Sequence, residues 1–186
     1  MQDIHPGVDV RVSANNRVAD LRNEGIDLAI RYTTPALAPA GAVRLFGETV
    51  APVAHPSLAL PPLASAEAIA ALNLLEFDDA QRPWLQWRDW LAAAGWADAR
   101  PRGMLRFNQY DQLIQAAMAG QGVALGRLEL IQPLLDDRRL VRVEAALPAQ
   151  PSGHAYWLIQ AEPQPREEVR HVAEWLVAEA KGSAPR

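Results

Sequence analysis

Two short polar segments of the sequence have the residue types that bind small molecules. Asn108-Gln109-Tyr110 stands between a predicted strand and a predicted helix, and Ser13, Asn15 and Asn16 occupy a similar turn nearer the start of the chain. The first N–H groups of a helix have no partner within it and lie at the positive end of its dipole, so such a turn can receive a carboxylate or another electron-rich group. Asparagine amides add both donors and acceptors. The alternative is that these side chains only cap the helices, which accounts more readily for one asparagine than for two.

Three other side chains are candidates for the same ligand. Arg31 and Tyr32 end a predicted strand, and ligands of open α/β sheets bind beyond the carboxyl ends of strands. Arg31 could hold a carboxylate through two parallel hydrogen bonds, or could pair with a nearby surface acid. Tyr156 lies on a strand that would carry the chain from one lobe to the other, where its hydroxyl could reach a ligand or its ring could pack in the core. For Tyr110 the alternative to ligand binding is also packing, at the edge of its helix.

The sequence lacks the residue combinations that the common classes of enzyme use. The four histidines (His5, His55, His154 and His171) have no paired spacing suited to a metal, there is no cysteine, and no G-x-S-x-G segment provides a serine nucleophile. The glycines of 120–126 end a predicted helix and begin a predicted strand, whereas a phosphate-binding loop connects a strand to the helix that follows it. We therefore expect no catalytic residue, no metal ion and no cofactor.

The elements that would position the candidate residues follow from the hydrophobic pattern. Val8 to Val12 alternates apolar and polar residues and predicts a strand. Residues 18–21 predict a short helix that ends near Gly25, and Ile26 to Ile30 predicts a second strand. A strand, a helix and a strand in this order predict a parallel βαβ unit with a right-handed crossover.

Further along the chain, predicted strands and helices continue to alternate. Apolar runs predict strands at 43–54, 104–107, 123–125, 140–143 and 155–159, and helical spacing predicts helices at 65–72, 84–94, 110–119, 127–135 and from Pro165. The tryptophans between 84 and 96 recur at helical spacing, which favours packing in the core over a stacking surface for ligands. Alternation of this kind predicts an α/β fold with mostly parallel sheets.

The composition is that of an ordinary globular domain: of 186 residues, 49% are hydrophobic and 22% charged, with a formal net charge of −4. Basic residues are scattered and often neighbour acids, as in Arg88-Asp89, so the basic stripe of a nucleic-acid surface is absent. The lack of cysteine fits a reducing compartment, and the first residues have neither the basic nor the apolar region of an export signal. No apolar run approaches the roughly 18 residues that a membrane span needs. We therefore predict a cytoplasmic protein that touches neither membrane nor DNA through these residues.

Several segments of the sequence resemble the effector-binding (substrate-binding) domain of LysR-type transcriptional regulators. The resemblance runs in order from about His5 to Ala180, and its most specific part surrounds Asn108-Gln109-Tyr110. It is strongest to the subgroup that contains the glycine-cleavage activator and the β-lactamase regulator. The segments that carry it are Val10–Leu21, Glu24–Tyr32, Trp87–Gly95, Phe107–Asp111, Ala116–Leu125 and Tyr156–Leu158.

The resemblance implies a two-lobed, periplasmic-binding-protein-like (type II) fold around an effector cleft. Residues 1–55 and 156–186 would form lobe I, and residues 56–155 would form lobe II. It also implies a regulator that assembles as a homo-oligomer. The sequence departs from the family pattern because it contains neither the helix-turn-helix, which would make the DNA contact, nor the first strand and helix of the effector domain. Lobe I is therefore expected to be incomplete.

The sequence thus favours a regulatory domain that binds a small anionic or amide-bearing effector between two lobes and controls transcription as part of an intact regulator. A solute-binding protein of a transport system with the same fold is the first alternative, and it predicts an export signal. An enzyme on an α/β scaffold is the second, and it predicts a nucleophile or a metal site. The third alternative is a remnant without a role of its own.

Overall fold

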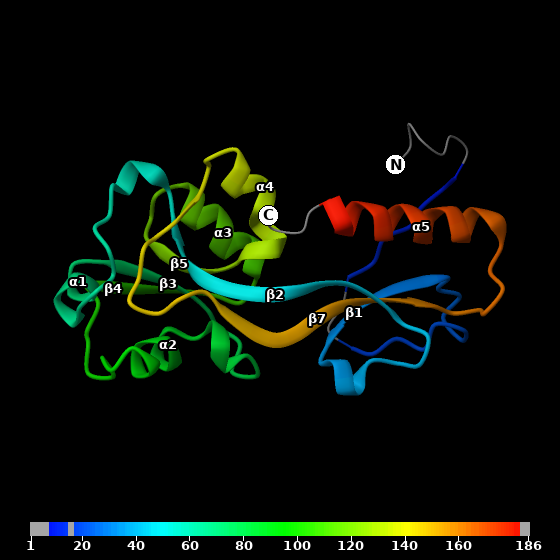
Figure 1. Cartoon of the computed structure of the whole chain (residues 1–186), viewed down its shortest axis with the longest axis horizontal. Coiled ribbons are helices and arrows are strands. Elements are labelled where there is room, and N and C mark those ends of the chain that lie inside the picture. Colours follow the sequence, from blue (N-terminus) through cyan, green and yellow to red (C-terminus); the bar gives the residue numbers. More distant parts are fainter. Residues whose placement is uncertain (1–7, 15–16, 183–186) are drawn as a thin grey trace. The chain divides into compact units, whose positions relative to one another are not determined.

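The computed structural model describes residues 8–14 and 17–182, and it divides the chain into two compact units (Figure 1). Unit 1 comprises the residues up to Gly47 and those from Gly153 onward, and unit 2 runs from Glu48 to Ser152. Two long strands, β2 (Val43–Ala54) and β7 (Gln150–Gln160), are hydrogen-bonded neighbours, and each contains one unit boundary. The chain therefore enters unit 2 along β2 and leaves it along β7. The assignment of these units to the two lobes of the family stays a prediction.

Unit 2 is built on a mixed sheet in the order β2-β5-β3-β4, with β6 also beside β2. Its strands, besides β2, are β3 (Asn73–Phe77), β4 (Gly103–Phe107), β5 (Val123–Arg127) and β6 (Val141–Arg142). Strand β3 pairs in parallel with β4 and β5, whereas β2 pairs in antiparallel with β5 and β6. All of β5 and most of β3 are buried, as is typical of strands that are covered on both faces.

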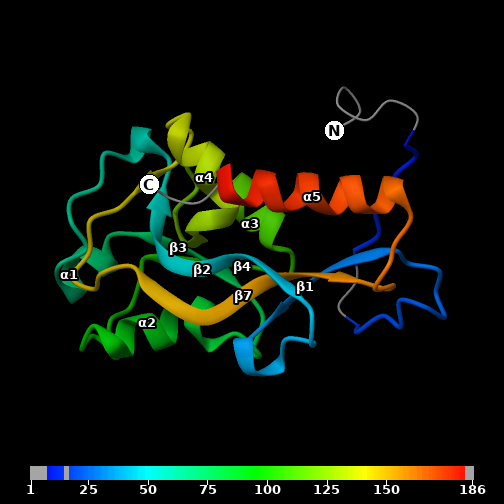
Figure 2. The same ribbon diagram turned by 45° about the vertical axis from the view of Figure 1, so that its right-hand side comes forward.

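Helices cover both faces of the sheet in unit 2. Figures 1 and 2 show α3 and α4 on one face and α2 on the other. The α-helices are α1 (Ala66–Ala70), α2 (Trp87–Ala93), α3 (Tyr110–Met118) and α4 (Leu128–Asp136), and single 3₁₀ turns form at Pro56–Leu58 and Pro83–Leu85. Each 3₁₀ turn begins at a proline, whose fixed φ suits the first helical position.

The tryptophans near α2 pack into the core of unit 2, as predicted. Trp87 is fully buried, and its indole N–H donates to the carbonyl of Leu75 at 2.9 Å. Trp90 is also buried, with its ring centroid 5.4 Å from that of Trp87. Trp84 and Trp96 are partly buried and pack against the same core. The indole of Trp87 thus ties α2 to the middle of β3.

Two glycines shape the connection between α3 and β5. Gly120 follows the C-cap residue Ala119 of α3 with a φ of 72°, a left-handed conformation that glycine adopts at low cost. Gly122 lies so close to β3 that a Cβ added to it would stand 2.4 Å from the carbonyl oxygen of Asn73. A larger residue at position 122 would push β5 away from its parallel neighbour.

Unit 1 contains β1 (Leu28–Thr33), which pairs in antiparallel with β7 so that Tyr32 lies opposite Tyr156. A 3₁₀ turn at Pro35–Leu37 follows β1. The last helix, α5 (Glu167–Gly182), runs alongside these strands in both views (Figures 1 and 2). It buries Val169, Ala173 and Ala180, in keeping with its predicted amphipathic pattern.

Four predictions for the start of the chain and for the sheet were wrong. Residues 8–12 form no strand, residues 18–20 form no helix, and residues 21–25 form a turn. The parallel βαβ unit is therefore absent from the described residues, and β1 pairs in antiparallel with β7 instead. The sheet is mixed rather than mostly parallel, because β1, β2, β6 and β7 take part in antiparallel pairs.

The physical reason is that a strand pattern needs a neighbouring strand and a surface to cover. Val10 and Val12 are 42% and 86% exposed, so the apolar face of the alternating segment buries little area. A helix of one turn gains too few hydrogen bonds to form without packing, and Val18 is 74% exposed. Gly25 does take the predicted positive φ, at 65°, where it closes the turn.

Candidate functional site

The carboxyl ends of the parallel strands in unit 2 gather polar groups at one edge of the sheet. Strand β3 lies between β4 and β5, and the three strands end at Phe77, Phe107 and Arg127. Helix α3 begins three residues after Phe107, and α4 begins directly after Arg127. The connection from β3 to β4 runs through α2 on one face of the sheet, and the connection from β4 to β5 runs through α3 on the other face (Figures 1 and 2). This edge is therefore the kind of switch point at which open α/β sheets bind ligands.

Asn108 and Gln109 lie at this edge, exposed, between β4 and α3. Gln109 is the N-cap residue of α3, and no side chain caps the helix there. The alternative that Asn108 serves only as a cap is therefore wrong. The first-turn N–H groups of α3 keep their capacity to bind an acceptor, although Asp111 in the same turn reduces the attraction for a full negative charge.

Tyr110 points from the start of α3 toward the end of β5. Its hydroxyl accepts a hydrogen bond from the backbone N–H of Arg127 at 2.7 Å. The Arg127 guanidinium lies over the Tyr110 ring, 5.3 Å from the centroid, and Phe77 meets the ring edge-on at 5.9 Å. Tyr110 thus packs at the edge of its helix, and it also fixes the position of Arg127 beside the start of α3.

A buried ion pair that the sequence analysis did not identify lies at the same edge. Arg127 Nε donates to the carboxylate of Glu48, and these residues are only 6% and 3% exposed. The indole N–H of Trp84 donates to the other carboxylate oxygen at 2.8 Å. We call Glu48, Trp84, Tyr110 and Arg127 the carboxyl-edge cluster. Hydrogen bonds to both carboxylate oxygens reduce the cost of burying the charge of Glu48.

Strand pairing explains why Glu48 and Arg127 meet. In the antiparallel ladder of β2 and β5, Val50 lies opposite Arg127, and Glu48 is two residues before Val50 on the same face. The pair joins residues 79 positions apart in the sequence. The one signal in the sequence was an arginine that directly ends a buried apolar strand, and it did not indicate the partner.

Thr49 and Glu129 reinforce the connection beside the carboxyl-edge cluster. The backbone N–H and the hydroxyl of Thr49 donate to the two carboxylate oxygens of Glu129, both at 2.7 Å. Glu129 lies in the first turn of α4, where a negative charge is favoured by the helix dipole. Together with the ion pair, these bonds fix the first residues of β2 in unit 2 against the starts of α3 and α4.

In unit 1 the structure brings together two of the predicted ligand residues and separates a third. Tyr32 and Tyr156 are paired across β1 and β7, with ring centroids 5.0 Å apart. His154 stacks on Tyr32 at 5.0 Å, and Phe46 lies 4.8 Å from Tyr156. Arg31 is adjacent to Tyr32 in β1, so its side chain leaves the opposite face of the strand. Arg31 therefore does not share a site with the two tyrosines.

The predicted site near the start of the chain is only partly described. Ser13 is exposed in an irregular segment, and Asn15 and Asn16 lie outside the described residues. Downstream of them, Arg17 donates to both carboxylate oxygens of Glu24, one of them at 2.6 Å, and the Asp20 N–H donates to Glu24 at 3.0 Å. These bonds hold the turn at 17–25. The role of Ser13, Asn15 and Asn16 in ligand binding stays a prediction.

The Arg17–Glu24 pair gives a testable shift in acidity. The hydrogen bond from Arg17, and then the Asp20 N–H, lower the pKa of Glu24 below its ordinary value. Since the folded-state pKa is the lower one, the pair favours the folded turn above the unfolded-state pKa of Glu24, and this contribution is lost as the pH falls through the folded-state pKa. We expect R17Q to raise the NMR titration midpoint of the Glu24 carboxyl, but not fully, because the Asp20 N–H remains.

R11Q is the matched control for this titration, since Arg11 is exposed in the same part of the chain and is not among the groups that shift the pKa of Glu24. An unchanged Glu24 midpoint in R17Q would contradict the assignment of the shift to Arg17.

Two further properties concern the described part of the chain. Nowhere within it do three or more histidine, cysteine or acidic side chains gather closely enough to hold a metal ion. None of its helices has the length and apolar character needed to cross a lipid bilayer.

The chain is similar in sequence to regulators of transcription. It is 26% identical over 174 residues to the HTH-type transcriptional activator AmpR of Citrobacter freundii, which covers 92% of this chain and 57% of that protein. It is 31% identical over 139 residues to the glycine cleavage system transcriptional activator of Escherichia coli K12, covering 74% of this chain and 44% of that protein. The chain therefore spans less than two thirds of the length of these curated relatives.

Solved structures agree with the fold. The effector domain of AmpR from Pseudomonas aeruginosa superimposes with a TM-score of 0.67 at 27% identity, over 98% of this chain and 86% of that one. The regulatory domain of AphB from Vibrio vulnificus gives a TM-score of 0.63 at 18% identity, over 95% of this chain and 86% of that one, which supports the fold alone. These matches confirm the predicted periplasmic-binding-protein-like α/β fold.

A model of one protein family covers nearly the whole chain. The family is described as the LysR substrate binding domain, and the match extends over residues 2–181. It includes the polar turn at 108–110, the aromatic residues of β1 and β7, and both strands that connect the units. On this match, the chain belongs to the LysR substrate-binding domain family, as the resemblance of its sequence predicted.

Proposed function

We propose that this chain is the effector-sensing part of a LysR-type transcriptional regulator, and that its effector binds at the carboxyl edge of unit 2. The observation that carries the proposal is the start of α3, where no side chain caps the helix and Asn108 and Gln109 are exposed. The carboxyl-edge cluster lies directly beside this turn, and its member Arg127 fixes Tyr110 in place. The effector would accept hydrogen bonds from the first N–H groups of α3 and exchange hydrogen bonds with the two amide side chains.

The chemistry of this edge favours a small anionic or amide-bearing metabolite. Asp111 weakens the pull on a full negative charge, so a carboxamide, or a carboxylate that makes several hydrogen bonds, fits better than a bare anion. Tyr32 and Tyr156 of unit 1, whose rings are in contact with each other, are further candidates for ligand binding. The proposed parts of Ser13, Asn15, Asn16 and Arg31 rest on the sequence alone.

We propose that the chain acts by binding and not by catalysis. Its relatives are named as transcriptional activators, and the chain matches 57% of the length of one of them. DNA contact and assembly into a homo-oligomer would then be functions of an intact regulator. An effector that binds one conformation of the chain better than another shifts the equilibrium by that difference in affinity, and the intact regulator would respond to this shift.

The experiment is an NMR titration of the ¹⁵N-labelled chain with single L-amino acids, dicarboxylates and cell-wall peptides. A ligand of this site is expected to shift the amide signals of residues 108–112 more than those elsewhere. Asn108→Ala and Gln109→Ala should each weaken its binding by about fivefold to tenfold, the loss of one good hydrogen bond.

Gln115→Ala is the matched control, since Gln115 is exposed further along the same helix. A ligand that binds the chain while leaving residues 108–112 unperturbed, or that binds N108A and Q109A as tightly as the unchanged chain, would refute this location.

A further inference from the structure

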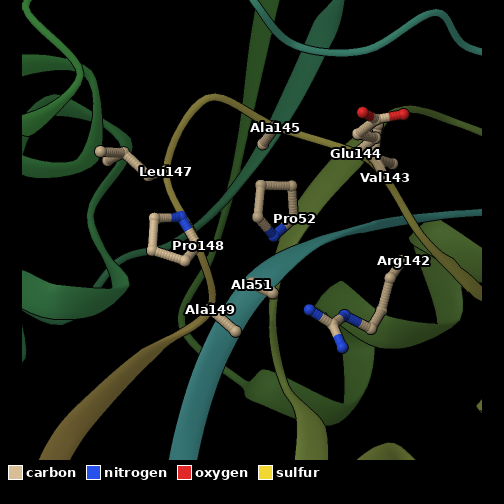
Figure 3. A pocket seen from close by; sticks show the side chains of 9 residues that line it. All are labelled: Ala51, Pro52, Arg142, Val143, Glu144, Ala145, Leu147, Pro148 and Ala149. Carbon is tan, nitrogen blue, oxygen red and sulfur yellow. The ribbon is translucent and has the colours of Figure 1, made fainter.

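Unit 2 contains a pocket that the proposed effector site does not use. It has a volume of about 390 Å³ and is lined by Ala51 and Pro52 of β2 and by seven of the residues between Arg142 and Ala149 (Figure 3). None of these residues belongs to the carboxyl-edge cluster or to the turn at 108–110. The volume is within the range of roughly 300–1,000 Å³ that is usual for small-molecule sites.

The pocket forms because regular strand pairing stops at two prolines. The N–H of Val143 donates to the carbonyl of Pro52 at 2.9 Å, but Pro52 has no N–H to return a bond. The segment then turns to Leu63, whose N–H donates to the carbonyl of Glu144 at 2.7 Å. Pro148 ends this segment two residues before β7 begins. The segment that begins at Val143 is therefore hydrogen-bonded to Pro52 of β2 and to Leu63, but an open space remains beside β2.

One part of the wall of this space is apolar. Ala51, Pro52 and Pro148 contribute short or rigid hydrocarbon surfaces, whereas the Leu147 side chain points away from both proline rings in Figure 3. Rigid walls lose little conformational entropy when a ligand binds, which favours the burial of a small aliphatic group. An aliphatic side chain of three to four carbons is therefore a suitable occupant of this part of the pocket.

Two opposite charges stand at the pocket with no partner in the described part of the chain. Arg142 and Glu144 both line it, both are exposed, and neither side chain makes an ion pair or a hydrogen bond to another described residue, or to each other. They are two residues apart on an extended segment, so both leave the same side of it, about 7 Å apart at Cα. Figure 3 shows the Arg142 guanidinium directed toward β2, away from the carboxylate of Glu144.

We propose that this pocket binds a small zwitterion with an apolar side chain, the chemistry of an aliphatic α-amino acid. The ligand carboxylate binds the Arg142 guanidinium, and the ligand ammonium binds the Glu144 carboxylate. Its side chain packs against Pro52 and Pro148. A molecule with a single charge would leave Glu144 or Arg142 unpaired, so it binds more weakly. This second site is independent of the proposed effector site at residues 108–110.

The test compares three probes of one carbon skeleton by NMR titration of the whole chain. L-leucine has both charges, 4-methylpentanoate lacks the ammonium group, and 3-methylbutylamine lacks the carboxylate. L-leucine is expected to shift the amide signals of residues 142–147, and each singly charged probe to bind about fivefold more weakly, as an exposed ion pair contributes at most about 1 kcal/mol.

Variants locate the binding within the pocket. R142Q should abolish the preference for L-leucine over 3-methylbutylamine, and E144Q should abolish the preference over 4-methylpentanoate. R139Q is the matched control, because Arg139 is exposed three residues earlier and does not line the pocket. Equal binding of all three probes, shifts confined to residues outside the pocket, or unchanged preferences in R142Q and E144Q would each overturn the proposal. Binding of L-leucine at residues 108–112 instead would support the effector site and overturn this one.

Discussion

Replacing Arg127 by methionine is expected to lower the free energy of unfolding of unit 2 by about 3–5 kcal/mol, the usual cost of removing one partner of a buried ion pair. The physical reason is the Glu48 carboxylate, which is 3% exposed and would be left without its counter-ion. The hydrogen bond from the Trp84 indole N–H to this carboxylate would remain, but it supplies no positive charge. Urea unfolding followed by far-ultraviolet circular dichroism measures the change, with the slope of the transition checked for constancy.

The substitution R127M has two effects: the Glu48 carboxylate loses its counter-ion, and the packing of the Arg127 side chain is lost. The double variant E48Q/R127M separates them. Glutamine keeps an acceptor for the Trp84 indole N–H and carries no charge, so the double variant should recover a large part of the loss. R88M serves as the control, because the side chains of Arg88 and its ion-pair partner Asp89 are 84% and 40% exposed and the pair should contribute less than about 1 kcal/mol. A single variant as stable as the unchanged chain would contradict the buried geometry of this pair.

Replacing Trp87 by alanine is expected to destabilise unit 2 by about 3–5 kcal/mol, the range for removing a large aromatic side chain from a core. Trp87 has no exposed surface, and its indole N–H satisfies the carbonyl of Leu75 in the central strand β3. The substitution opens a cavity and also leaves this buried carbonyl without its donor. Loss of protection from hydrogen exchange in β3 and α2 would accompany the loss of stability.

Two further substitutions distinguish the cavity from the hydrogen bond. Trp87→Phe fills most of the volume but cannot donate to Leu75, so it should lose about 1–3 kcal/mol. Trp96→Ala is the control, since Trp96 is only partly buried at the rim of the same core and should lose less than Trp87→Ala. If Trp87→Ala and Trp96→Ala were equally mild, the central place of Trp87 in the core would be wrong.

The carboxyl-edge cluster links these stability effects to the proposed function. Glu48 is the first residue of the chain in unit 2, and its partner Arg127 precedes α4 directly. Loss of the pair would release Tyr110 from one of its contacts and so disturb the start of α3. Binding at residues 108–112 should therefore be compared between the unchanged chain and E48Q/R127M only under conditions in which both are folded.

The family and most of the elements could be predicted from local sequence. The amphipathic pattern of 167–182, the apolar run at 123–125 and the glycine at 120 each act through neighbouring residues, and each lies in its predicted element. The tryptophans were assigned to the core because helical spacing places them on one face of α2 and its preceding turn. Local pattern was sufficient wherever burial and hydrogen bonding are satisfied within a few residues.

Local pattern failed where the outcome depends on a distant neighbour. Residues 8–12 have the alternation of a strand, but 42% and 86% exposure of Val10 and Val12 shows that no surface covers them. Strand β1 was predicted to be parallel to a preceding strand, whereas β7, from the other end of the chain, is its partner. All the strands of a chain compete for pairing partners, so the residues of one strand do not by themselves determine which strand it pairs with.

The sequence by itself determined the family, the alternation of strands and helices, the polar turn at 108–110 and the lack of enzymatic side-chain combinations. Only the tertiary structure decided that Tyr110 supports Arg127, that Tyr32 lies against Tyr156, and that Glu48 and Arg127 form a buried ion pair. Propensity and periodicity are properties of neighbours along the chain. Charge pairing and pocket formation depend on which strands lie side by side, and here the ladder of β2 and β5 joins residues more than 70 positions apart.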